Sequence, residues 1–593
     1  MSEVVLFDGA WRAGVGERGF AADELRRYLA RLAGRKPPRR SQCPIRFQQD
    51  GRIPAQGYRI VVSRSGITIR FGDEKGRLNG TYGLLETLGC RWFVPGDRGE
   101  LVPGKQLLCL HCGELAAKPS HEAITFIQDV TTLRDYSDER LVERQWADDL
   151  ALFDWMGRNR LTTLRGHVGL VEQGRGKLPQ AKRAMAQRHI AEEIGGHIIS
   201  HLLPRNLFEK HPEYFPVNAA GLRTSRGNVC VSNRDALEVI ADNARRLLRP
   251  AEVLHCWGQD VSGGAWCHCE KCRTLPVAEQ YLRVVNRVAD AVAESAPGTK
   301  VAYIAYYDTL DANLTSRPRP NVLLLFAPRS RCYAHTIDES RCETNRRHFE
   351  SFCRYREVFK AVETFEYYGD CLLYCTSNAS IPWTVARDIE SYHRNGVSRS
   401  GCLMFGGAAW LFAPINLYVF ARKSWDVNAD ADDIVRQFCD GFYPGVGSEM
   451  LGYHRELEEA MGLLLETSDW RYRPACFDGP RRVSLALKKL EELASRLCEL
   501  LLSVPTGSAH ALALEKATLD LTILNVRSFC RELQARGTEG PRRSVHLREA
   551  RTLMSKYLRE IVKIPSELRG SWCSERNGEL RRLAERSNRG SRT

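Results

Sequence analysis

Residues 252–272, EVLHCWGQDVSGGAWCHCEKC, combine a lone carboxylate with a cysteine triplet. A short apolar run stops at Asp260, and a glycine-rich stretch and three cysteines follow it. Enzymes built on parallel strands place their chemistry in the loops beyond the strand ends. The pattern therefore predicts a buried strand that delivers the Asp260 carboxylate into an active-site loop.

Other apolar runs along the middle of the chain also end in acidic residues. Asp308 follows one such run, and Glu366 and Asp370 close another. Carboxyl groups at strand ends are suited to general acid and base catalysis. Each can equally be a helix cap or a loop anchor, so the sequence alone assigns none of them a role.

The cysteine triplet, Cys267, Cys269 and Cys272, has the spacing C-x-C-x-x-C. Three thiols in six residues can bind zinc with a fourth ligand from His255, Cys256, His268 or elsewhere. The motif lacks a second C-x-x-C pair, so reduced thiols or a disulfide stay open as alternatives. A thiolate-rich site is closed and structural, so we expect no catalytic zinc. A cysteine nucleophile is not favoured either, because no Cys–His motif accompanies these thiols.

The region from 120 to 413 repeats a unit of apolar run, polar loop and helix, and eight such units predict a (β/α)8 barrel. Helices are expected at 235–248, 278–295, 342–358 and 384–395. The expected strands are 123–128, 160–165, 197–203, 253–258, 301–306, 321–327, 362–367 and 401–405.

The flanking regions have different patterns. Residues 1–119 predict a small α/β domain with a strand at 4–7, a helix at 23–32 and a hairpin at 58–62 and 67–71. A helix that begins near Arg77 carries Gly80 and Gly83, small residues that let it lie close to a sheet. Residues 414–593 predict a helical domain, because apolar residues recur at helical spacing over 483–501, 512–533 and 545–562.

Composition narrows the classes of function. The net charge is +14, partly from arginine-rich segments at 36–40 and 581–592. No nucleic-acid-binding motif accompanies these basic residues, so we expect them to form a solvated surface, and we expect no nucleic-acid partner. No apolar run approaches the roughly 20 residues of a membrane span, and the start lacks a signal-peptide pattern. Twenty scattered cysteines indicate reduced thiols and a cytoplasmic protein. A homo-oligomer is compatible with the sequence, which leaves the oligomeric state open.

Several strings resemble a domain-of-unknown-function family of predicted glycoside hydrolases that is allied to α-glucuronidases and β-hexosaminidases. They are GTYGLLETLGCRWFVPG near the N-terminus, HLLPRNLFEKHPEYFPVNAAG, NVCVSN and GQDVSGGAWCHCEKC in the middle, and FCDGFYP at 438–444. The resemblance covers nearly the whole chain. It implies a hexosaminidase-like N-terminal domain, a catalytic-type barrel and a helical C-terminal domain.

The resemblance also implies a reaction. Glycosidic cleavage usually uses two carboxyl groups and needs no cofactor, and by analogy with α-glucuronidase-like barrels we expect Asp260 and Glu366 to be that pair, with Asp260 as the acid. β-N-Acetylhexosaminidases place Asp-Glu where this chain has Gln259-Asp260, which argues against their substrate-assisted mechanism. The alternative function is a carbohydrate-binding or sensing barrel without catalysis.

Polar and aromatic residues on the same predicted face are candidates for holding a carbohydrate substrate. If the substrate contains a uronic acid, Arg329 or Arg331 can bind its carboxylate in a bidentate manner. Tyr306, Tyr307, Tyr367 and Trp410 can stack on sugar rings. Each can also be a packing residue at the barrel rim. The full set of candidate substrate-binding residues is His167, His201, Tyr306, Asp308, Arg329, Arg331, His335, Asp370 and Trp410.

Overall fold

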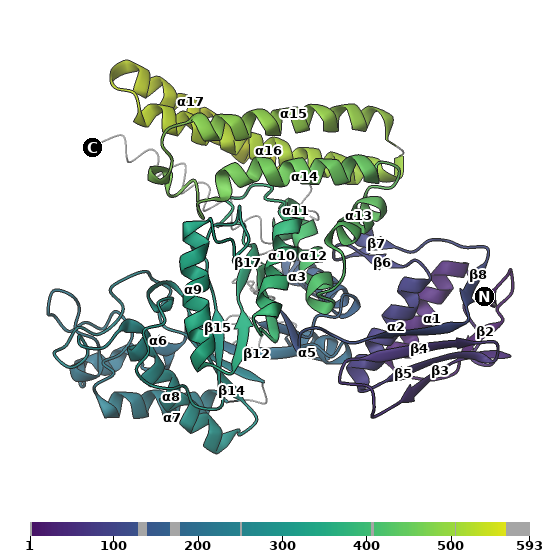
Figure 1. The fold of residues 1–593 in the computed structure, drawn as a ribbon, viewed down its shortest axis with the longest axis horizontal. Helices are drawn as coiled ribbons and strands as arrows, with labels where there is room; N and C mark the ends of the chain where they lie inside the picture. The colour runs from purple at the N-terminus through teal and green to yellow at the C-terminus, as the bar shows by residue number, and fades with distance from the viewer. Residues whose placement is uncertain are drawn as a thin grey trace.

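The computed structural model describes residues 3–127, 139–165, 178–248, 252–404, 408–504 and 506–564. Figure 1 shows a purple N-terminal α/β domain, a parallel barrel in the centre and a layer of green to yellow helices above it. This arrangement confirms the predicted fold class. The exact domain boundaries at 119 and 413 stay predictions.

The barrel strands β10 to β16 pair in parallel in chain order, β18 pairs next to β16, and β10 pairs with β18 to close the ring. Two short strands, β16 and β17, together occupy the place of the predicted strand 362–367, because both pair with β18. The strands are β10 (Ala123–Ile127), β11 (Thr163–Arg165), β12 (Ala191–Gly196), β13 (Val253–Cys256), β14 (Lys300–Ala305), β15 (Val322–Phe326), β16 (Ala361–Thr364), β17 (Glu366–Gly369) and β18 (Arg399–Met404).

The predicted third strand was wrong. The apolar run at 197–203 instead contains the short helix α6 (Ile199–Leu202), and the strand is β12, whose sequence is AEEIGG. Two acidic residues and two glycines are unfavourable in a strand, so the sequence hid it. Glu193 is nevertheless fully buried in β12, because ion pairs inside the barrel satisfy its carboxylate.

Charged side chains fill part of the barrel interior. Arg165 on β11 pairs with Glu193 on β12 at 2.7 Å and with Glu363 on β16 at 2.6 Å. Arg399 on β18 contacts the same two carboxylates at 2.7 and 3.0 Å. These strands are not all neighbours, so the contacts cross the interior. His255 on β13 adds a contact to Glu193 at 2.9 Å.

Helices surround the strands. α8 buries Tyr281, Leu282, Val285 and Val288 along one face, as its predicted amphipathic pattern requires. The predicted helices of this region are confirmed. The helices are α3 (Glu139–Arg158), α5 (Leu178–Gln187), α7 (Arg234–Leu247), α8 (Val277–Ser295), α9 (Glu343–Val358), α10 (Pro382–Arg394), α11 (Ala408–Phe412) and α12 (Pro414–Trp425).

The N-terminal domain packs α1 (Phe20–Ala33) and α2 (Glu74–Thr87) on a sheet of order β2-β3-β5-β4-β9. A Cβ atom on Gly80 would lie 2.6 Å from Ile69, and one on Gly83 would lie 2.5 Å from Tyr58, so both glycines allow the predicted close approach of α2. The strands of this domain are β1 (Glu3–Phe7), β2 (Ala13–Val15), β3 (Cys43–Gln49), β4 (Tyr58–Ser63), β5 (Gly66–Phe71), β6 (Arg91–Trp92), β7 (Glu100–Leu101), β8 (Leu108–His111) and β9 (Gly113–Ala117).

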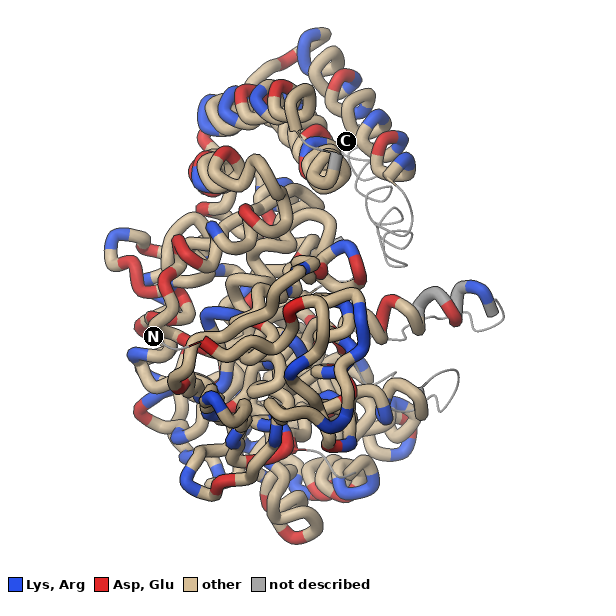
Figure 2. Tube along the Cα trace, turned by 90° about the vertical axis from the view of Figure 1, so that its right-hand side faces the viewer, with Lys and Arg blue, Asp and Glu red and all other residues tan. Residues whose placement is uncertain are grey.

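The predicted C-terminal helices are also confirmed, and two more precede them. They are α13 (Ala431–Phe442), α14 (Gly447–Leu465), α15 (Arg481–Ser503), α16 (Thr506–Arg536) and α17 (Gly540–Ile561). Figure 2 shows basic and acidic residues interspersed along them. Among the described residues, no helix is both long and apolar enough to cross a membrane.

We expect that removing one charged partner from the barrel ion pairs will lower the stability of the protein strongly. Glu363→Gln removes one of the two buried carboxylates that pair with Arg165 and Arg399, and the exposed Glu252 contacts Arg399 alone. The free energy of unfolding should therefore fall by about 3–5 kcal/mol in chemical denaturation. The control is Glu491→Gln, which removes an exposed partner of Arg527 and should cost under about 1 kcal/mol. A Glu363→Gln cost as small as the control's would contradict an essential role for the network.

Buried histidines should make the protein acid-sensitive. Burial lowers the pKa of His121 and of His255 to about 4 and that of His454 to about 3. Unfolded histidine takes up a proton near pH 6.5, so their stabilisation is complete above pH 6.5 and is lost as the pH falls toward 4. Thermal melts between pH 7.5 and 4.5 should show a falling Tm. His255→Gln should flatten that slope, whereas His211→Gln, at a half-exposed position, should leave it unchanged.

Candidate active site

The loops after β13 and β14 meet at the carboxyl ends of the barrel strands. The Asp260 side chain is exposed there, and Tyr306 donates its hydroxyl hydrogen to the Asp260 carboxylate over 3.1 Å. Asp308 accepts the Gly263 backbone N–H with both carboxylate oxygens at 2.9 Å. The structure thus brings three predicted site residues, Asp260, Tyr306 and Asp308, into one loop cluster.

A small pocket opens within this cluster. Its lining includes His197, Asn228, Gln259, Tyr306 and Asp308. His197 and Asn228 were not predicted as site residues. His197 begins the run that the sequence assigned to the third strand, and Asn228 belongs to the NVCVSN string. The pocket combines ring faces with amide and carboxylate groups, and its volume of about 30 Å³ accommodates about one water molecule and no sugar ring.

Aromatic rings extend from this pocket. The ring centroids of Tyr306 and Tyr307 are 4.0 Å apart, and Tyr367 stacks on Phe365 at 4.9 Å with an interplanar angle of 12°. Burial raises the pKa of Tyr306 well above its usual value, so its hydroxyl stays a donor to Asp260 at neutral pH. Rings with a polar end can contact both the faces and the hydroxyl groups of a sugar.

Arg329 is already paired with two carboxylates. Its guanidinium binds Asp469 in a bidentate manner at 2.6 and 3.0 Å and Asp370 at 3.2 Å. Because both edges of the guanidinium are occupied, Arg329 orients Asp370 directly after β17. A substrate carboxylate would have to displace one of these partners to be clamped by Arg329.

Asp469 is a candidate that sequence reasoning missed. It lies in the loop after α14, and its φ of 54° is uncommon for a residue other than glycine. Burial raises the pKa of Asp469, which favours its protonated form more than in water. Unusual backbone geometry and a raised carboxyl pKa in one residue are typical of functional sites. No pattern in the sequence points to Asp469, because it reaches the barrel only through the packing of the C-terminal helices.

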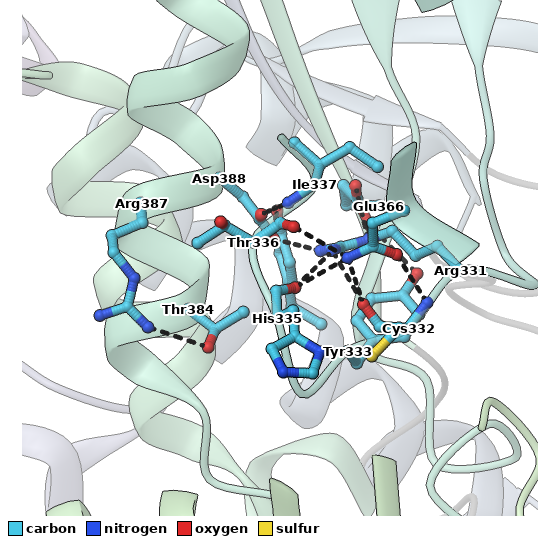
Figure 3. A network of polar contacts seen from close by, with 12 residues as sticks. Arg331, Cys332, Tyr333, His335, Thr336, Ile337, Glu366, Thr384, Arg387 and Asp388 are labelled. Carbon is cyan, nitrogen blue, oxygen red and sulfur yellow. Dashed lines mark hydrogen bonds and ion pairs between the residues drawn. The ribbon is translucent and has the colours of Figure 1, made fainter. Parts of the chain in front are cut away.

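Glu366 lies in a different environment from Asp260. Its carboxylate accepts hydrogen bonds from Tyr333 at 3.1 Å and Tyr392 at 2.6 Å, and it lies 3.2 Å from Nε of Arg331. Arg331 also pairs with Asp388 on α10, as Figure 3 shows. Glu366 is 1% exposed and Arg331 is fully buried, so neither contacts solvent.

The alternation of side chains along β17 explains this placement. Glu366 and Tyr368 occupy the same face of the strand and both contact α10, through Tyr392 and Asp388 respectively. Tyr367 points the opposite way, toward Arg329, whose guanidinium lies 5.8 Å from the Tyr367 ring centroid. The network around Glu366 therefore faces the helix layer and does not include Asp260.

The remaining predicted residues are dispersed. His201 is exposed on α6, and His335 contacts Cys332 with its ring at 3.2 Å and Arg331 with its carbonyl. Trp410 on α11 packs edge-to-face on Trp155 at 4.7 Å, so it belongs to a packing cluster. His167 lies outside the described residues.

The cysteine triplet gains a fourth member from the preceding loop. The Sγ atoms of Cys230, Cys267, Cys269 and Cys272 all lie within 4.8 Å of one another, a grouping that could hold a metal ion. The sequence left the fourth ligand open among His255, Cys256, His268 or another residue, and the structure brings Cys230 to the triplet. A second group, Cys332, His335 and Cys342, offers three such atoms.

The contrast between Glu366 and Asp260 can be measured. Glu366→Gln leaves a buried Arg331 with one anionic partner, so the free energy of unfolding should fall by about 3 kcal/mol. Asp260→Asn alters an exposed side chain and should change it by about 0.5 kcal/mol or less. Chemical denaturation of both variants checks this, with Tyr392→Phe as a milder probe of the network. Equal stability of the two variants would contradict a structural role for Glu366.

Comparisons with known proteins show that the fold is shared with glycosidases. The chain is 14% identical to a family GH115 4-O-methyl-α-glucuronidase with specificity for decorated arabinogalactans, with a TM-score of 0.60 over 93% of this chain and 77% of that one. It is 10% identical to a GH138 enzyme targeting pectin rhamnogalacturonan II, with a TM-score of 0.56 over 98% of this chain and 99% of that one. At these identities the likeness shows the fold alone. A search of curated proteins found no match.

A family model also matches the chain itself. Its description is Domain of unknown function (DUF4838), and it spans residues 119–453. These residues include the whole barrel and the loops that carry Asp260, Tyr306 and Asp370. Because the match extends over more than half of the chain, the protein belongs to the DUF4838 family.

Proposed function

We propose that this protein is a glycoside hydrolase that cleaves a glycosidic bond by two-carboxylate acid and base catalysis. The proposal depends chiefly on Asp260, an exposed carboxylate at the carboxyl ends of the barrel strands, hydrogen-bonded to Tyr306 and flanked by aromatic rings. A likeness in fold to two carbohydrate-active enzymes over nearly the whole chain supports it. Fold alone does not decide function, so the site carries the argument.

The second carboxyl group in this proposal is Asp370. It directly follows β17 on the side of Tyr367, and Arg329 and the Leu372 backbone N–H orient its oxygens. Glu366, expected from the sequence to be the partner, is proposed here as a positioning residue because it faces α10 and pairs there with Tyr392 and Arg331, on the face of β17 opposite Tyr367. Asp308 is the reserve candidate, since it lies in the same loop cluster as Asp260.

In the proposed reaction Asp260 donates a proton to the leaving glycosidic oxygen. Asp370 acts on the opposite side, either by activating water or by attacking the anomeric carbon. Water supplies the hydroxyl group of the new reducing end and restores the proton to Asp260. Carboxyl groups and water complete this chemistry, so the proposed reaction requires no cofactor.

We propose a uronic-acid-containing glycan as the substrate class. The support is the likeness to a 4-O-methyl-α-glucuronidase and to an enzyme targeting pectin rhamnogalacturonan II. The net charge of +14 would favour an acidic glycan over a neutral one. Arg331 is fully buried and Arg329 is doubly paired, so recognition of the uronate would depend on other groups at the barrel mouth.

A carbohydrate-binding barrel without catalysis is the second candidate. The enclosure of Asp370 and Glu366, whose side chains are 2% and 1% exposed, favours it. Only Asp260 among these three carboxylates is openly exposed. The two candidates make opposite predictions about turnover and the same prediction about sugar binding.

Hydrolysis of α-uronides, aryl glycosides and N-acetylhexosaminides by the purified protein tests the proposal. Asp260→Asn and Asp370→Asn should each lower kcat by at least about 100-fold on the substrate that is cleaved, with the fold intact. The matched control, Asp311→Asn, alters an exposed carboxylate in the loop after β14 and should retain turnover. Turnover that survives both substitutions would refute the pair, and sugar binding without any turnover would favour the non-catalytic barrel.

A further inference from the structure

We infer that Cys230, Cys267, Cys269 and Cys272 form a structural zinc site that fixes the loop carrying Asp260. Three of these thiols come from one short segment, and Cys230 comes from the loop before α7. The zinc site itself is independent of the proposed hydrolase activity. Its consequence for Asp260 rests on the proposed function.

The sulfur positions fit a tetrahedral site. Cys230 Sγ lies 3.7 Å from Cys269 Sγ and 4.0 Å from Cys272 Sγ. Four thiolates at about 2.3 Å from a zinc ion are about 3.8 Å apart. A disulfide needs sulfurs about 2 Å apart, so these distances suit a shared ion better than a covalent pair.

The surroundings of the sulfurs suit thiolates. Cys267 Sγ accepts backbone N–H groups from Val217 and Cys269, both at 3.4 Å. The Ser232 hydroxyl lies 3.2 Å from Cys230 Sγ and 3.6 Å from Cys269 Sγ. Such hydrogen bonds to the ligands stabilise metal-bound sulfur. Thiols used only as apolar packing would gain little from converging donors.

Four protein ligands define the type of site. Three of the cysteines are buried and Cys269 is half-buried, and all four positions of a tetrahedron are filled by sulfur. No position is left for water or substrate, so the ion would be structural. Zinc fits a four-thiolate tetrahedron, and binding energy at such a site is gained only in the folded state.

The site would hold together the two loops that build the pocket. The Asn228 backbone N–H donates to the Ala265 carbonyl at 2.8 Å, and the His268 backbone N–H donates to the Val217 carbonyl at 2.7 Å. The Asn228 side chain accepts the backbone N–H of Gln259 at 2.9 Å. Cys230 is two residues beyond Asn228, and Gln259 immediately precedes Asp260. The ion therefore fixes Asn228, and Asn228 fixes the start of the Asp260 loop.

The buried side chain of Gln280 on α8 secures the other side of the cluster. It accepts the Cys267 N–H at 3.2 Å and donates to the carbonyls of Cys267 and Cys272 at 3.2 and 3.0 Å. The cysteine segment is thus attached to a barrel helix. A cluster attached to α8 and to the pre-α7 loop can transmit the rigidity of the barrel to the Asp260 loop.

Elemental analysis of protein purified without chelator tests the site. We expect one zinc ion per chain, with X-ray absorption showing four sulfur neighbours at about 2.3 Å. Cys230→Ser and Cys272→Ser should lose most of the zinc. The matched control, Cys439→Ser, changes a fully buried thiol on α13 and should retain it. Full zinc content in Cys230→Ser, or no zinc in the wild-type protein, would overturn the inference.

Two measurements on the wild-type protein test the zinc site even if a cysteine variant fails to fold. Alkylation of denatured, chelator-treated protein should modify all twenty cysteines, whereas two disulfides within the cluster would leave four of them unmodified and would refute the zinc site. Hydrogen exchange should quicken in residues 228–231 and 258–266 on zinc removal if the ion fixes the loop. Unchanged exchange there would refute the positioning role, whatever the hydrolysis assays show.

Discussion

Charge neutrality inside the barrel is the constraint on which the rest of the structure depends. Arg165 and Arg399 share Glu193 and Glu363 across the interior, where an unpaired charge would be strongly destabilising. The partners lie on β11, β12, β16 and β18, so the charges can pair only when the ring is closed in this register. The network therefore specifies the strand register as well as filling the space, and the loops at the strand ends inherit their positions from it.

Most charged groups near the barrel mouth are neutralised in the same manner. Arg329 is shared by Asp370 and Asp469, and Arg331 is shared by Glu366 and Asp388. Asp260 differs because it accepts a hydrogen bond from a neutral tyrosine, Tyr306, and its side chain is exposed. This difference separates an openly exposed carboxylate from carboxylates that balance the charge of arginines, and the proposed reaction takes Asp260 from the first kind and Asp370 from the second. It also explains why the two predicted arginine clamps are occupied by the protein itself.

The C-terminal helices contribute to the barrel mouth as well as to its stability. Asp469 reaches Arg329 from the loop after α14, and Asn525 on α16 donates to the backbone of Cys375, in the segment after β17. The side-chain amide of Asn378 likewise donates a hydrogen bond to the buried carboxylate of Glu515 on α16. These contacts connect the loop after β17 to helices more than a hundred residues away in sequence. The orientation of Asp370 is therefore a joint property of the barrel and the helical region.

The sequence by itself determined the local elements: the apolar runs of seven barrel strands, the amphipathic helices, the strand-end position of Asp260 and the clustering of three cysteines. These features are local because they depend on periodicity and spacing within one segment. The third strand escaped detection because Glu193 is tolerated only by pairing with arginines on other strands. Tertiary structure alone decided that Glu366 faces α10, because both faces of a barrel strand are buried and EYYG carries no alternation to distinguish them. It also decided that Asp469 pairs with Arg329 and that Cys230 lies beside the cysteine triplet, because folding brings together residues that are far apart along the chain.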